Sequence, residues 1–547
     1  ADAVETDFAQ AVGHTVTVEL VDTSGGQACD ARPALSPAVS QLMTFSSADS
    51  GAKTSGNFAV DRAYRSVGCR VTDATDSPVI VGCSSDSFAV RPIAFNLNTP
   101  ALDNAGSSGT PIAKAGDSFT LQVGSAAGYD GIPLITAAPL EAHSGGAAGI
   151  LNGGFSAADI TTGTAEGTAF TYSEVGNFRF LADAIYDDSF TAIDQTGDCI
   201  DNSYSNGLSS GKVGCDFSNT TASDWVGRFT PDHFDVTIVE HGELLDVCTG
   251  FSYSATDIPF SADPLKQPEV TITALNSSNL TTVNYTGAYA KLVASDVNMP
   301  AITGDGSTNG VDGVTPVSLT WNAGSATLAD NGDGTLTFKL SGDSFTYGRG
   351  SNDLVAPFTA DVNMVIDAVT DSDAVSATGL PQTIEPAGVA VRYGRLNLLN
   401  AYGSELQTLP MTLQVEYYNG SGNGFVPNTI DACTSINNIV ITDADAGDSL
   451  QVGETCIWDS AGNSGSFGCA STGNPADQYS SIPVASNFNL NLMGPGAGNT
   501  GVLNVTAGAP AHLQFDWLGA GLGDPTGTAS FGIHNSNNRM IFMKEVR

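Results

Sequence analysis

The chain has 547 residues, too many for one hydrophobic core, so several domains are expected. Its 19 Lys and Arg residues stand against 58 Asp and Glu, and a formal net charge of -39 argues against nucleic acid or anionic lipid as a partner, because both bind through cationic patches. No apolar run approaches the ~18 residues that span a bilayer, so we expect no direct membrane insertion.

Short segments in which apolar and polar residues alternate recur along the chain, bounded by Gly, Asn, Asp or Pro. Alternation with period two indicates strands with one buried face, and long 3.6-residue patterns are scarce. The sequence therefore predicts an all-β protein built of tandem immunoglobulin-like β-sandwich domains. The clearest predicted strands are Thr15–Val21, Ser118–Val123, Phe234–Val239, Glu269–Leu275 and Thr335–Leu340.

Three proline-containing segments predict the domain boundaries. They are Arg91-Pro92, the segment around Pro231, and Pro381–Pro386, and each is followed by a new strand pattern. Proline ends ladder pairing and stiffens the connection. We therefore expect immunoglobulin-like sandwiches at residues 1–91 and 92–230, a third sandwich at 231–386, and a C-terminal β domain at 387–547.

The second domain has the clearest internal pattern. A turn at Gly176 is followed by a predicted strand that buries alternate side chains. Tyr172, just before it, resembles the tyrosine corner of immunoglobulin-type sandwiches, so we expect a buried ring with a hydroxyl partner. The expected buried residues of the strand are Phe178, Phe180, Ala182 and Ala184.

The segment Val391–Thr434 predicts strand, turn, strand, turn, strand. Tyr402-Gly403-Ser404 is expected to form the first turn, and Asn419 to Gly424 the glycine-rich tip of a hairpin. This segment resembles the C-terminal region of MshQ-type proteins, large surface proteins associated with mannose-sensitive haemagglutinin type IV pili of Gram-negative bacteria. The resemblance recurs in Cys83–Pro92, Phe170–Phe190, Trp225–Val236 and Asp524–Arg547.

The resemblance implies a secreted, multidomain β protein at the cell surface, with residues 387–547 as its MshQ-like domain. It transfers no catalytic residue to this chain. The six histidines are scattered, and the chain has neither G-x-S-x-G nor HExxH, even where His233 and His241 lie near acidic residues. We therefore expect no enzymatic activity and no catalytic residues.

Nine cysteines are spread singly, without a CxxC pair, which favours disulfides in an oxidising compartment over zinc. Cys199 and Cys215 bracket a polar loop and are expected to pair. Cys29 and Cys83 are expected to pair at strand ends of the first domain, where the family-like block begins. A third predicted disulfide joins Cys456 to Cys469, with Cys433 as a competing partner, and an odd count leaves at least one cysteine unpaired within the chain.

Two acidic loops are candidate calcium sites, and calcium is the only cofactor considered. Asp330 and Asp333 belong to an Asn-Gly and Asp-Gly sequence that is equally typical of a β-hairpin turn, the favoured reading. Asp443, Asp445 and Asp448 crowd three carboxylates at one turn, which a cation would screen.

Trp458 is the candidate ligand-binding residue because it lies in a Gly/Ser/Asn-rich stretch between Cys456 and Cys469. An exposed tryptophan there would stack on a sugar ring. The competing interpretation is that its ring covers a disulfide, as in immunoglobulin sandwiches.

These features predict a non-enzymatic extracellular structural or adhesive protein whose partners are pilus or cell-surface proteins. One alternative is a self-assembling subunit of an extracellular filament or sheath, a homopolymer joined by strand addition. Another is a carbohydrate-binding β-sandwich array. The apolar segment Met540–Arg547 is expected to pair as a strand, either with Thr528–Ile533 of its own domain or in a neighbouring molecule.

Overall fold

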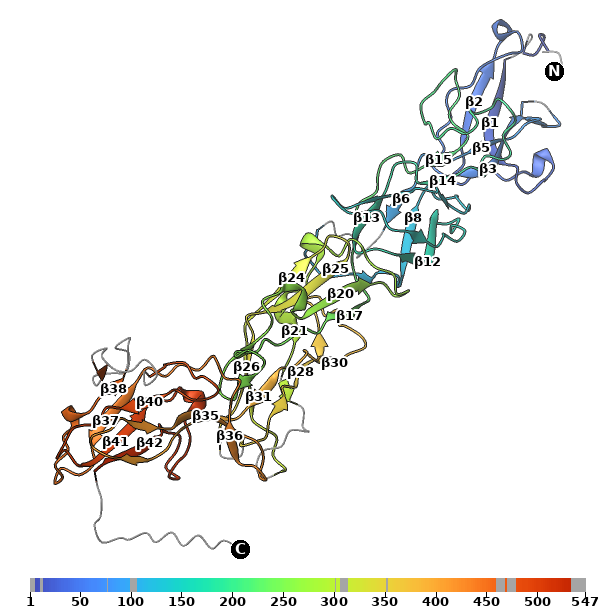
Figure 1. The fold of residues 1–547 in the computed structure, drawn as a ribbon. Helices are drawn as coiled ribbons and strands as arrows, with labels where there is room; N and C mark the ends of the chain where they lie inside the picture. Colours follow the sequence, from blue (N-terminus) through green and yellow to red (C-terminus); the bar gives the residue numbers. More distant parts are fainter. Residues whose placement is uncertain are drawn as a thin grey trace.

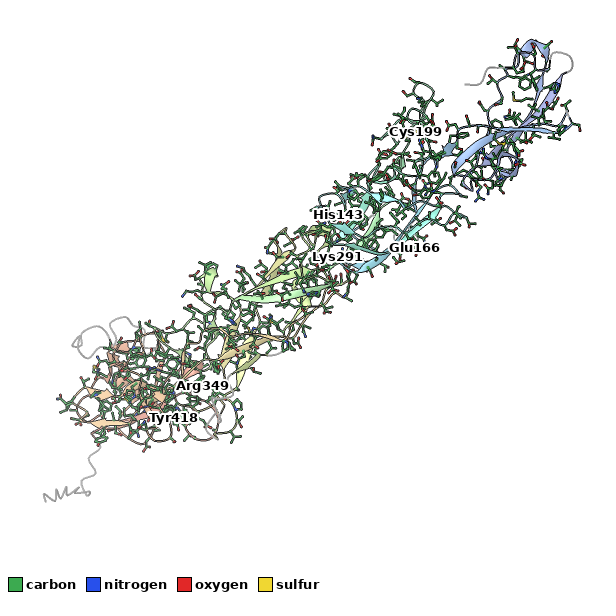
Figure 2. All side chains as sticks on the ribbon, turned by 90° about the vertical axis from the view of Figure 1, so that its right-hand side faces the viewer. His143, Glu166, Cys199, Lys291, Arg349 and Tyr418 are labelled. Carbon is green, nitrogen blue, oxygen red and sulfur yellow. A yellow bond between two sulfur atoms is a disulfide. The ribbon has the colours of Figure 1, made fainter. Side chains whose placement is uncertain are left out.

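The computed structural model describes residues 5–9, 13–75, 77–98, 106–300, 302–304, 313–350, 353–458, 468–469 and 479–532. Figure 1 shows β units following one another in chain order, from β1–β5 at one end to β37–β42 at the other. Figure 2, turned by 90°, shows the same extended course. The described chain is therefore an elongated rod.

Domain 1 contains one five-stranded sheet in the described residues, where two packed sheets were expected. The strand order is β2-β1-β3-β4, and β5 pairs with β3. Its cluster of packed, buried apolar residues is small and consists of Leu20, Leu35 and Val67. The strands are β1 (His14–Asp22), β2 (Ser40–Phe45), β3 (Tyr64–Asp73), β4 (Ile80–Cys83) and β5 (Phe88–Val90).

Domain 2 is a sandwich of two four-stranded sheets, β10-β13-β16-β7 and β11-β12-β8-β6, with a small sheet β15-β14-β9 beside them. Aromatic rings fill its core, because alternate residues of β12, β13 and β16 point inward. The strands are β6 (Asn96–Asn98), β7 (Ala113–Lys114), β8 (Ser118–Gly124), β9 (Leu134–Ile135), β10 (Leu140–Ala142), β11 (Leu151–Asn152), β12 (Thr164–Tyr172), β13 (Gly176–Phe180), β14 (Ile185–Asp187), β15 (Phe217–Ser218) and β16 (Val226–Thr230).

The predicted long strand of domain 2 is interrupted. Phe178, Phe180 and Ala184 are buried, but Ala182 is exposed, because β13 ends at Phe180 and β14 begins at Ile185. Asp183 between them adopts φ 61°, a left-handed conformation that a strand does not allow. Tyr172 is fully buried, and its hydroxyl accepts a hydrogen bond from the Gly149 amide at 3.1 Å, as expected.

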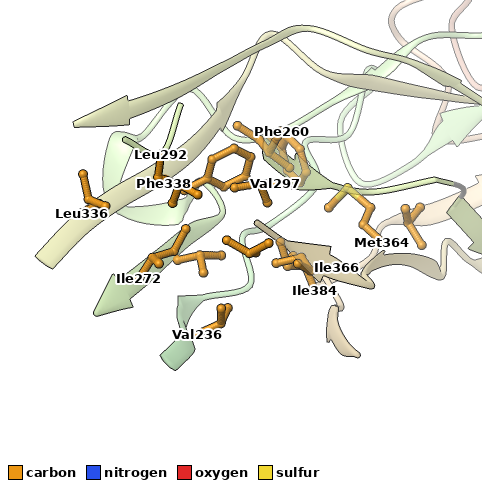
Figure 3. Close-up of a cluster of buried hydrophobic side chains, with 14 of the residues drawn as sticks. Val236, Phe260, Ile272, Leu292, Val297, Leu336, Phe338, Met364, Ile366 and Ile384 are labelled. Carbon is orange, nitrogen blue, oxygen red and sulfur yellow. The ribbon is translucent and has the colours of Figure 1, made fainter. Parts of the chain in front are cut away.

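Domain 3 has the largest core, where apolar side chains of several small sheets meet (Figure 3). Its main sheet has the order β17-β20-β25-β24. The strands are β17 (His233–Glu240), β18 (Ser252–Tyr253), β19 (Ile258–Pro259), β20 (Glu269–Leu275), β21 (Val297–Asn298), β22 (Ile302–Gly304), β23 (Leu319–Asn322), β24 (Ser325–Asp330), β25 (Thr335–Ser341), β26 (Ser344–Tyr347), β27 (Phe358–Thr359), β28 (Val362–Ile366), β29 (Ala368–Val369), β30 (Gln382–Ile384) and β31 (Ala390–Arg392).

Domain 4 packs sheets β33-β42-β41-β37 and β34-β40-β38-β39 with a third sheet, β32-β35-β36. Its strands are β32 (Gly394–Leu398), β33 (Ala401–Gly403), β34 (Leu409–Met411), β35 (Leu413–Tyr418), β36 (Phe425–Pro427), β37 (Ile439–Asp443), β38 (Ile457–Trp458), β39 (Gly468–Cys469), β40 (Leu490–Leu492), β41 (Gly501–Ala507) and β42 (Thr526–Phe531). The fold is thus all-β and built of tandem immunoglobulin-like domains, as predicted, except that domain 1 has a single sheet in the described residues.

Helical structure in the described chain is limited to single 3-10 turns that connect strands. They are η1 (Cys29–Ala31), η2 (Ser47–Asp49), η3 (Pro264–Lys266), η4 (Gly287–Tyr289), η5 (Ala294–Asp296), η6 (Val452–Glu454) and η9 (Ala511–Leu513). Across the described residues, no helix has the length and apolar character needed to cross a membrane.

Two expectations for the C-terminal domain need correction. Tyr402 and Gly403 were expected in a turn but lie in β33, which pairs in parallel with β42. β42 also pairs with β41, so both of its edges are occupied over Ala529–Phe531. That segment therefore has no free edge there for the predicted hairpin with Met540–Arg547, which lies outside the described residues. The glycine-rich tip after Asn419 joins β35 to β36, as predicted.

Four hydrophobic cores follow one another along the chain, and side chains cross each of the predicted boundaries. Ala63 packs into the core of domain 2, and Val175 packs into the core of domain 3. Cys248, Phe251 and Tyr253 come from the range expected for domain 3 but pack into the core of domain 4. Neighbouring domains therefore share buried side chains at their junctions.

Candidate functional site: the domain junctions

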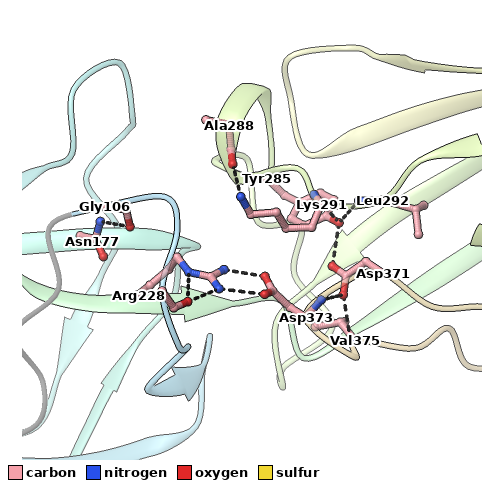
Figure 4. A network of polar contacts seen from close by, with 11 residues as sticks. Gly106, Asn177, Arg228, Tyr285, Ala288, Lys291, Leu292, Asp371, Asp373 and Val375 are labelled. Atoms are coloured by element: carbon pink, nitrogen blue, oxygen red, sulfur yellow. Dashed lines mark hydrogen bonds and ion pairs between the residues drawn. The ribbon is translucent and has the colours of Figure 1, made fainter.

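The junction between domains 2 and 3 is centred on an ion pair (Figure 4). Arg228, on β16, donates through two nitrogens to the carboxylate oxygens of Asp373 at 2.5 and 2.8 Å. It also donates to the Gly109 carbonyl at 2.7 Å. The Arg228 guanidinium holds the pKa of Asp373 below its usual value. Arg228 is 3% exposed, so the two domains are joined by a buried, bidentate pair.

A second set of contacts surrounds that pair. The buried Glu174 carboxylate accepts the amides of Val283 and Asn284 at 3.3 and 3.2 Å, and burial raises its pKa. The Asn284 side chain in turn donates to and accepts from the backbone of Ala147, both at 2.8 Å. The His143 ring packs on the Tyr289 ring with centroids 4.0 Å apart. Side chains of both domains thus interlock on several sides.

The junction between domains 1 and 2 uses exposed and half-buried groups. Arg65 forms an ion pair with Asp130 at 2.6 Å, and the Ala89 amide donates to Asp194 at 2.6 Å. Arg91, expected at this boundary, donates to the Gly214 carbonyl at 2.7 Å and is bonded to further acceptors of the same loop. The long loop between β14 and β15 is therefore fixed against the linker.

The junction between domains 3 and 4 is covalently closed. A disulfide joins Cys248 to Cys433, which lie 185 positions apart. Beside it, Arg349 donates to the Gln514 carbonyl and lies 4.2 Å from the centroid of the Tyr393 ring. The sequence interpretation missed this disulfide. Cys433 was considered only as a competing partner for the third predicted pair, and that alternative is wrong.

The other cysteines agree with the predicted pattern in part. Cys29 pairs with Cys83 and Cys199 pairs with Cys215. Cys456 is disulfide-bonded, and the side chain of Cys469, its predicted partner, lies outside the described residues. Cys69 is a free thiol, whose pKa is raised by burial.

The carboxylates of the two candidate calcium loops accept local hydrogen bonds. Asp330 and Asp333 flank the β24–β25 turn, with Gly332 and Gly334 at positive φ, so this segment is a hairpin. The oxygens of both aspartates accept hydrogen bonds from neighbouring amides and hydroxyls.

At the second loop, Asp443, Asp445 and Asp448 each accept a backbone amide instead of converging. Among the described residues, the group of three possible metal ligands within 4.8 Å is Cys248, Asp431 and Cys433, and its two sulfurs form the disulfide. Among the described residues, the three carboxylates of the second loop do not form such a group.

The histidines and tryptophans have structural contacts. His233 bonds to the adjacent Asp232 at 2.8 Å, and His241 accepts the Glu385 amide at 2.9 Å. Trp321 donates its ring N–H to Asp343 at 2.8 Å. The backbone of Trp458 lies in β38, and its side chain, the candidate sugar contact, lies outside the described residues.

Models of one protein family match most of the chain. Residues 174–388 match the third domain of DUF6701, and residues 392–546 match its fourth domain. The chain contains two consecutive DUF6701 domains. The match to the third DUF6701 domain begins at residue 174. Val175, which was predicted to belong to domain 2, packs into the core of domain 3.

Among solved structures, the chain is similar to two tandem immunoglobulin proteins. One is the I9–I11 tandem of titin, with 8% identity, 78% of this chain and 97% of that chain covered, and a TM-score of 0.20. The other is the full ectodomain (Ig1–Ig3) of mouse nectin-like molecule 4, with 10% identity, 77% and 97% covered, and a TM-score of 0.16. No curated protein matches the chain.

Proposed function

We propose that this DUF6701 protein is a non-enzymatic, extracellular spacer that holds an adhesive or structural surface away from the cell, in association with pili or other cell-surface proteins. The observation that carries the proposal is the continuity of the three junctions. A flexible string of domains would need none of the buried contacts at Arg228 and Glu174, or the disulfide at Cys248.

Three further properties support the proposed location, the separation of the rods in solution and the proposed partner. The disulfides Cys29–Cys83, Cys199–Cys215 and Cys248–Cys433 persist in an oxidising compartment. The net charge of -39 keeps long rods apart in solution. The resemblance of five sequence blocks to MshQ-type proteins favours pili as the partner.

The contacts of His233 and His241 do not favour an enzymatic role. The ring nitrogens of His233 and His241 that bond within the chain contact an adjacent carboxylate and a backbone amide, not a nucleophilic side chain. General base catalysis needs a base within hydrogen-bond reach of the group that it deprotonates. These contacts are the ones expected of a structural protein.

Electron microscopy of cells that produce the protein tests this function. Gold-labelled antibodies against domain 1 and domain 4 should label intact cells or their pili, with the two labels separated along one rod. Label that appears only after the cells are opened would contradict the proposal. Purified protein that forms regular end-to-end polymers would favour the filament-subunit alternative instead.

A further inference from the structure

A cavity at the junction of domains 3 and 4 has a buried arginine in its wall. The cavity has a volume of about 360 Å³ and lies between the segment that follows β26 and the loop that follows η9. The first segment carries Arg349, which Figure 2 labels where the last two domains meet. Four of the lining side chains are aliphatic or aromatic, those of Leu354, Tyr393, Phe515 and Leu522. The cavity therefore combines an apolar lining with a cation.

Arg349 lacks a counter-charge. It is 8% exposed, and its Nε and Nη1 atoms are buried without a hydrogen-bond partner. Its Nη2 donates to the Gln514 carbonyl, and none of the arginine ion pairs within 4.0 Å in the described chain includes it. By contrast, the comparably buried Arg228 donates to both carboxylate oxygens of Asp373. A buried cation without an anion is costly, so the wall of this cavity is incomplete without one.

The charged groups around the cavity do not supply that anion. Asp516 lines the cavity but is exposed, and it accepts a backbone amide of its own loop at 3.2 Å. The Asp353 carboxylate accepts the Gly350 amide at 2.5 Å. Burial and the nearby Arg349 lower the pKa of His512 to about 4, so its ring is neutral at pH 7. Burial also lowers the pKa of Arg349, yet a guanidinium stays charged at neutral pH.

The walls of the cavity are held in place by contacts within the chain. The loop that carries Phe515 is closed by two backbone hydrogen bonds between Phe515 and Gly523, at 3.2 and 3.1 Å. The guanidinium of Arg395, which is paired with Glu416, lies 5.2 Å from the centroid of the Phe515 ring. A ligand would therefore meet a formed cavity and would not have to order the loop first.

The lining and the charge together select the kind of anion. The Asp516 carboxylate on the wall repels a doubly charged phosphate or sulfate more strongly than a singly charged carboxylate. The apolar side chains favour a ligand that carries its carboxylate on an apolar group. We propose that this cavity binds such an apolar carboxylate, supplied by the free C-terminus of a partner chain that ends in an apolar residue or by a small carboxylic acid.

Isothermal titration calorimetry of the whole chain at about 0.15 M salt tests the proposal without reference to the location of the protein. The probes are acetyl-Ala-Ala-Leu with a free carboxylate, the same peptide as its C-terminal amide, and 4-methylpentanoate. At least one carboxylate probe should bind saturably, and the amide should bind at least about tenfold more weakly than the free peptide or not at all. Binding of the peptide alone identifies a partner's C-terminus, and binding of 4-methylpentanoate identifies a small acid.

Variants of the wall test the role of the arginine. R349M should weaken binding of the carboxylate probe about tenfold or more, because the ligand loses its charged donor. The control R179M removes the same charge at a more exposed arginine of domain 2 and should leave affinity unchanged. Three results would overturn the proposal: no saturable binding of either carboxylate probe, equal affinity for the peptide and its amide, or equal loss of affinity in R349M and R179M.

A second pair of variants applies if R349M does not melt like the unsubstituted protein. Leu522 lines the cavity and is 45% exposed, so L522E keeps the fold and places a carboxylate where it repels the ligand. Binding should weaken about tenfold. The control L518E adds the same charge on the same loop at a side chain that is 92% exposed and outside the lining, and it should retain affinity. Equal affinities of L522E and L518E would overturn the proposal.

Discussion

Tyr285 donates its buried hydroxyl to Asp371 at 2.9 Å, although the two residues lie 86 positions apart. The other oxygen of Asp371 accepts the backbone amides of Asp373 and Val375, so one carboxylate closes a turn and fixes a core tyrosine. The same arrangement occurs twice more. Asp187 accepts Tyr129 at 2.7 Å, and Asp431 accepts Tyr253 at 2.7 Å, each while accepting amides of its own turn.

This repeated pair predicts a clear cost for removing one hydroxyl. In Y285F the buried Asp371 carboxylate loses a donor and is left partly unpaired, so the free energy of unfolding should fall by about 1–3 kcal/mol. The matched control is Y402F, because Tyr402 is 85% exposed and should change stability by less than about 0.5 kcal/mol. Urea unfolding checks both, and equal stability of the two variants would contradict the role of the pair.

The ion pair at the junction of domains 2 and 3 should be costly to break. In R228A the half-buried Asp373 carboxylate loses both charged donors, so we expect the free energy of unfolding to fall by about 3 kcal/mol. The control R179A breaks the more exposed pair with Glu141 and should cost about 1 kcal/mol or less. Differential scanning calorimetry should show the effect in the transition of domains 2 and 3.

The same pair predicts a pH dependence. The pKa of Asp373 is lower in the folded chain than its unfolded value of about 4. The ion pair therefore adds to the free energy of unfolding above that unfolded pKa, and this stabilisation is lost as the pH falls through the folded-state pKa. R228A should lack this part of the acid destabilisation. Identical acid-unfolding profiles for R228A and the unsubstituted protein would contradict the assignment.

The disulfide Cys248–Cys433 should stabilise the junction of domains 3 and 4 most strongly. In the chain-entropy model, closing 185 positions restricts the unfolded chain by roughly 5 kcal/mol, against roughly 3 kcal/mol for the 16 positions between Cys199 and Cys215. The double variant C248S/C433S should therefore lower the melting temperature of domains 3 and 4 more than C199S/C215S lowers that of domain 2. The reverse order would show that the junction does not depend on the disulfide.

His512 should make the last junction sensitive to mild acid. Its ring stacks on Tyr253, and burial together with the nearby Arg349 lowers its pKa to about 4. In the unfolded chain His512 takes up a proton near pH 6.5. The free energy of unfolding is therefore highest above pH 6.5 and falls by up to about 3 kcal/mol as the pH drops to about 4. Melting curves of H512Q should lack this loss, whereas the control H241Q, at an exposed histidine, should retain it.

Much of the fold was predictable because half-buried strands impose period two on the sequence. The predicted strands Glu269–Leu275 and Thr335–Leu340 correspond to β20 and β25, and Pro231 lies between β16 and β17. The prediction from local sequence was wrong where a long-range contact determines the secondary structure. Tyr402 and Gly403 have turn composition, yet parallel pairing with β42 makes them a strand.

The junction contacts were not predictable in the same way. Arg228 and Asp373 are 145 positions apart, and neither has a local pattern that distinguishes it from a surface residue. Cys433 carried a signal, because it was an unassigned cysteine in an oxidising pattern, but several partners fitted it equally well. Only the packing of Phe251 and Tyr253 into domain 4 brings Cys248 to it.

The most direct test of the account is the distribution of shapes in electron micrographs of single purified molecules. Interlocked junctions predict straight rods of one length, with a narrow distribution of angles at the middle junction that broadens in R228A and not in R179A. Molecules that bend freely at every junction, with equal angular spread in all three proteins, would contradict the claim that this chain is a rigid spacer.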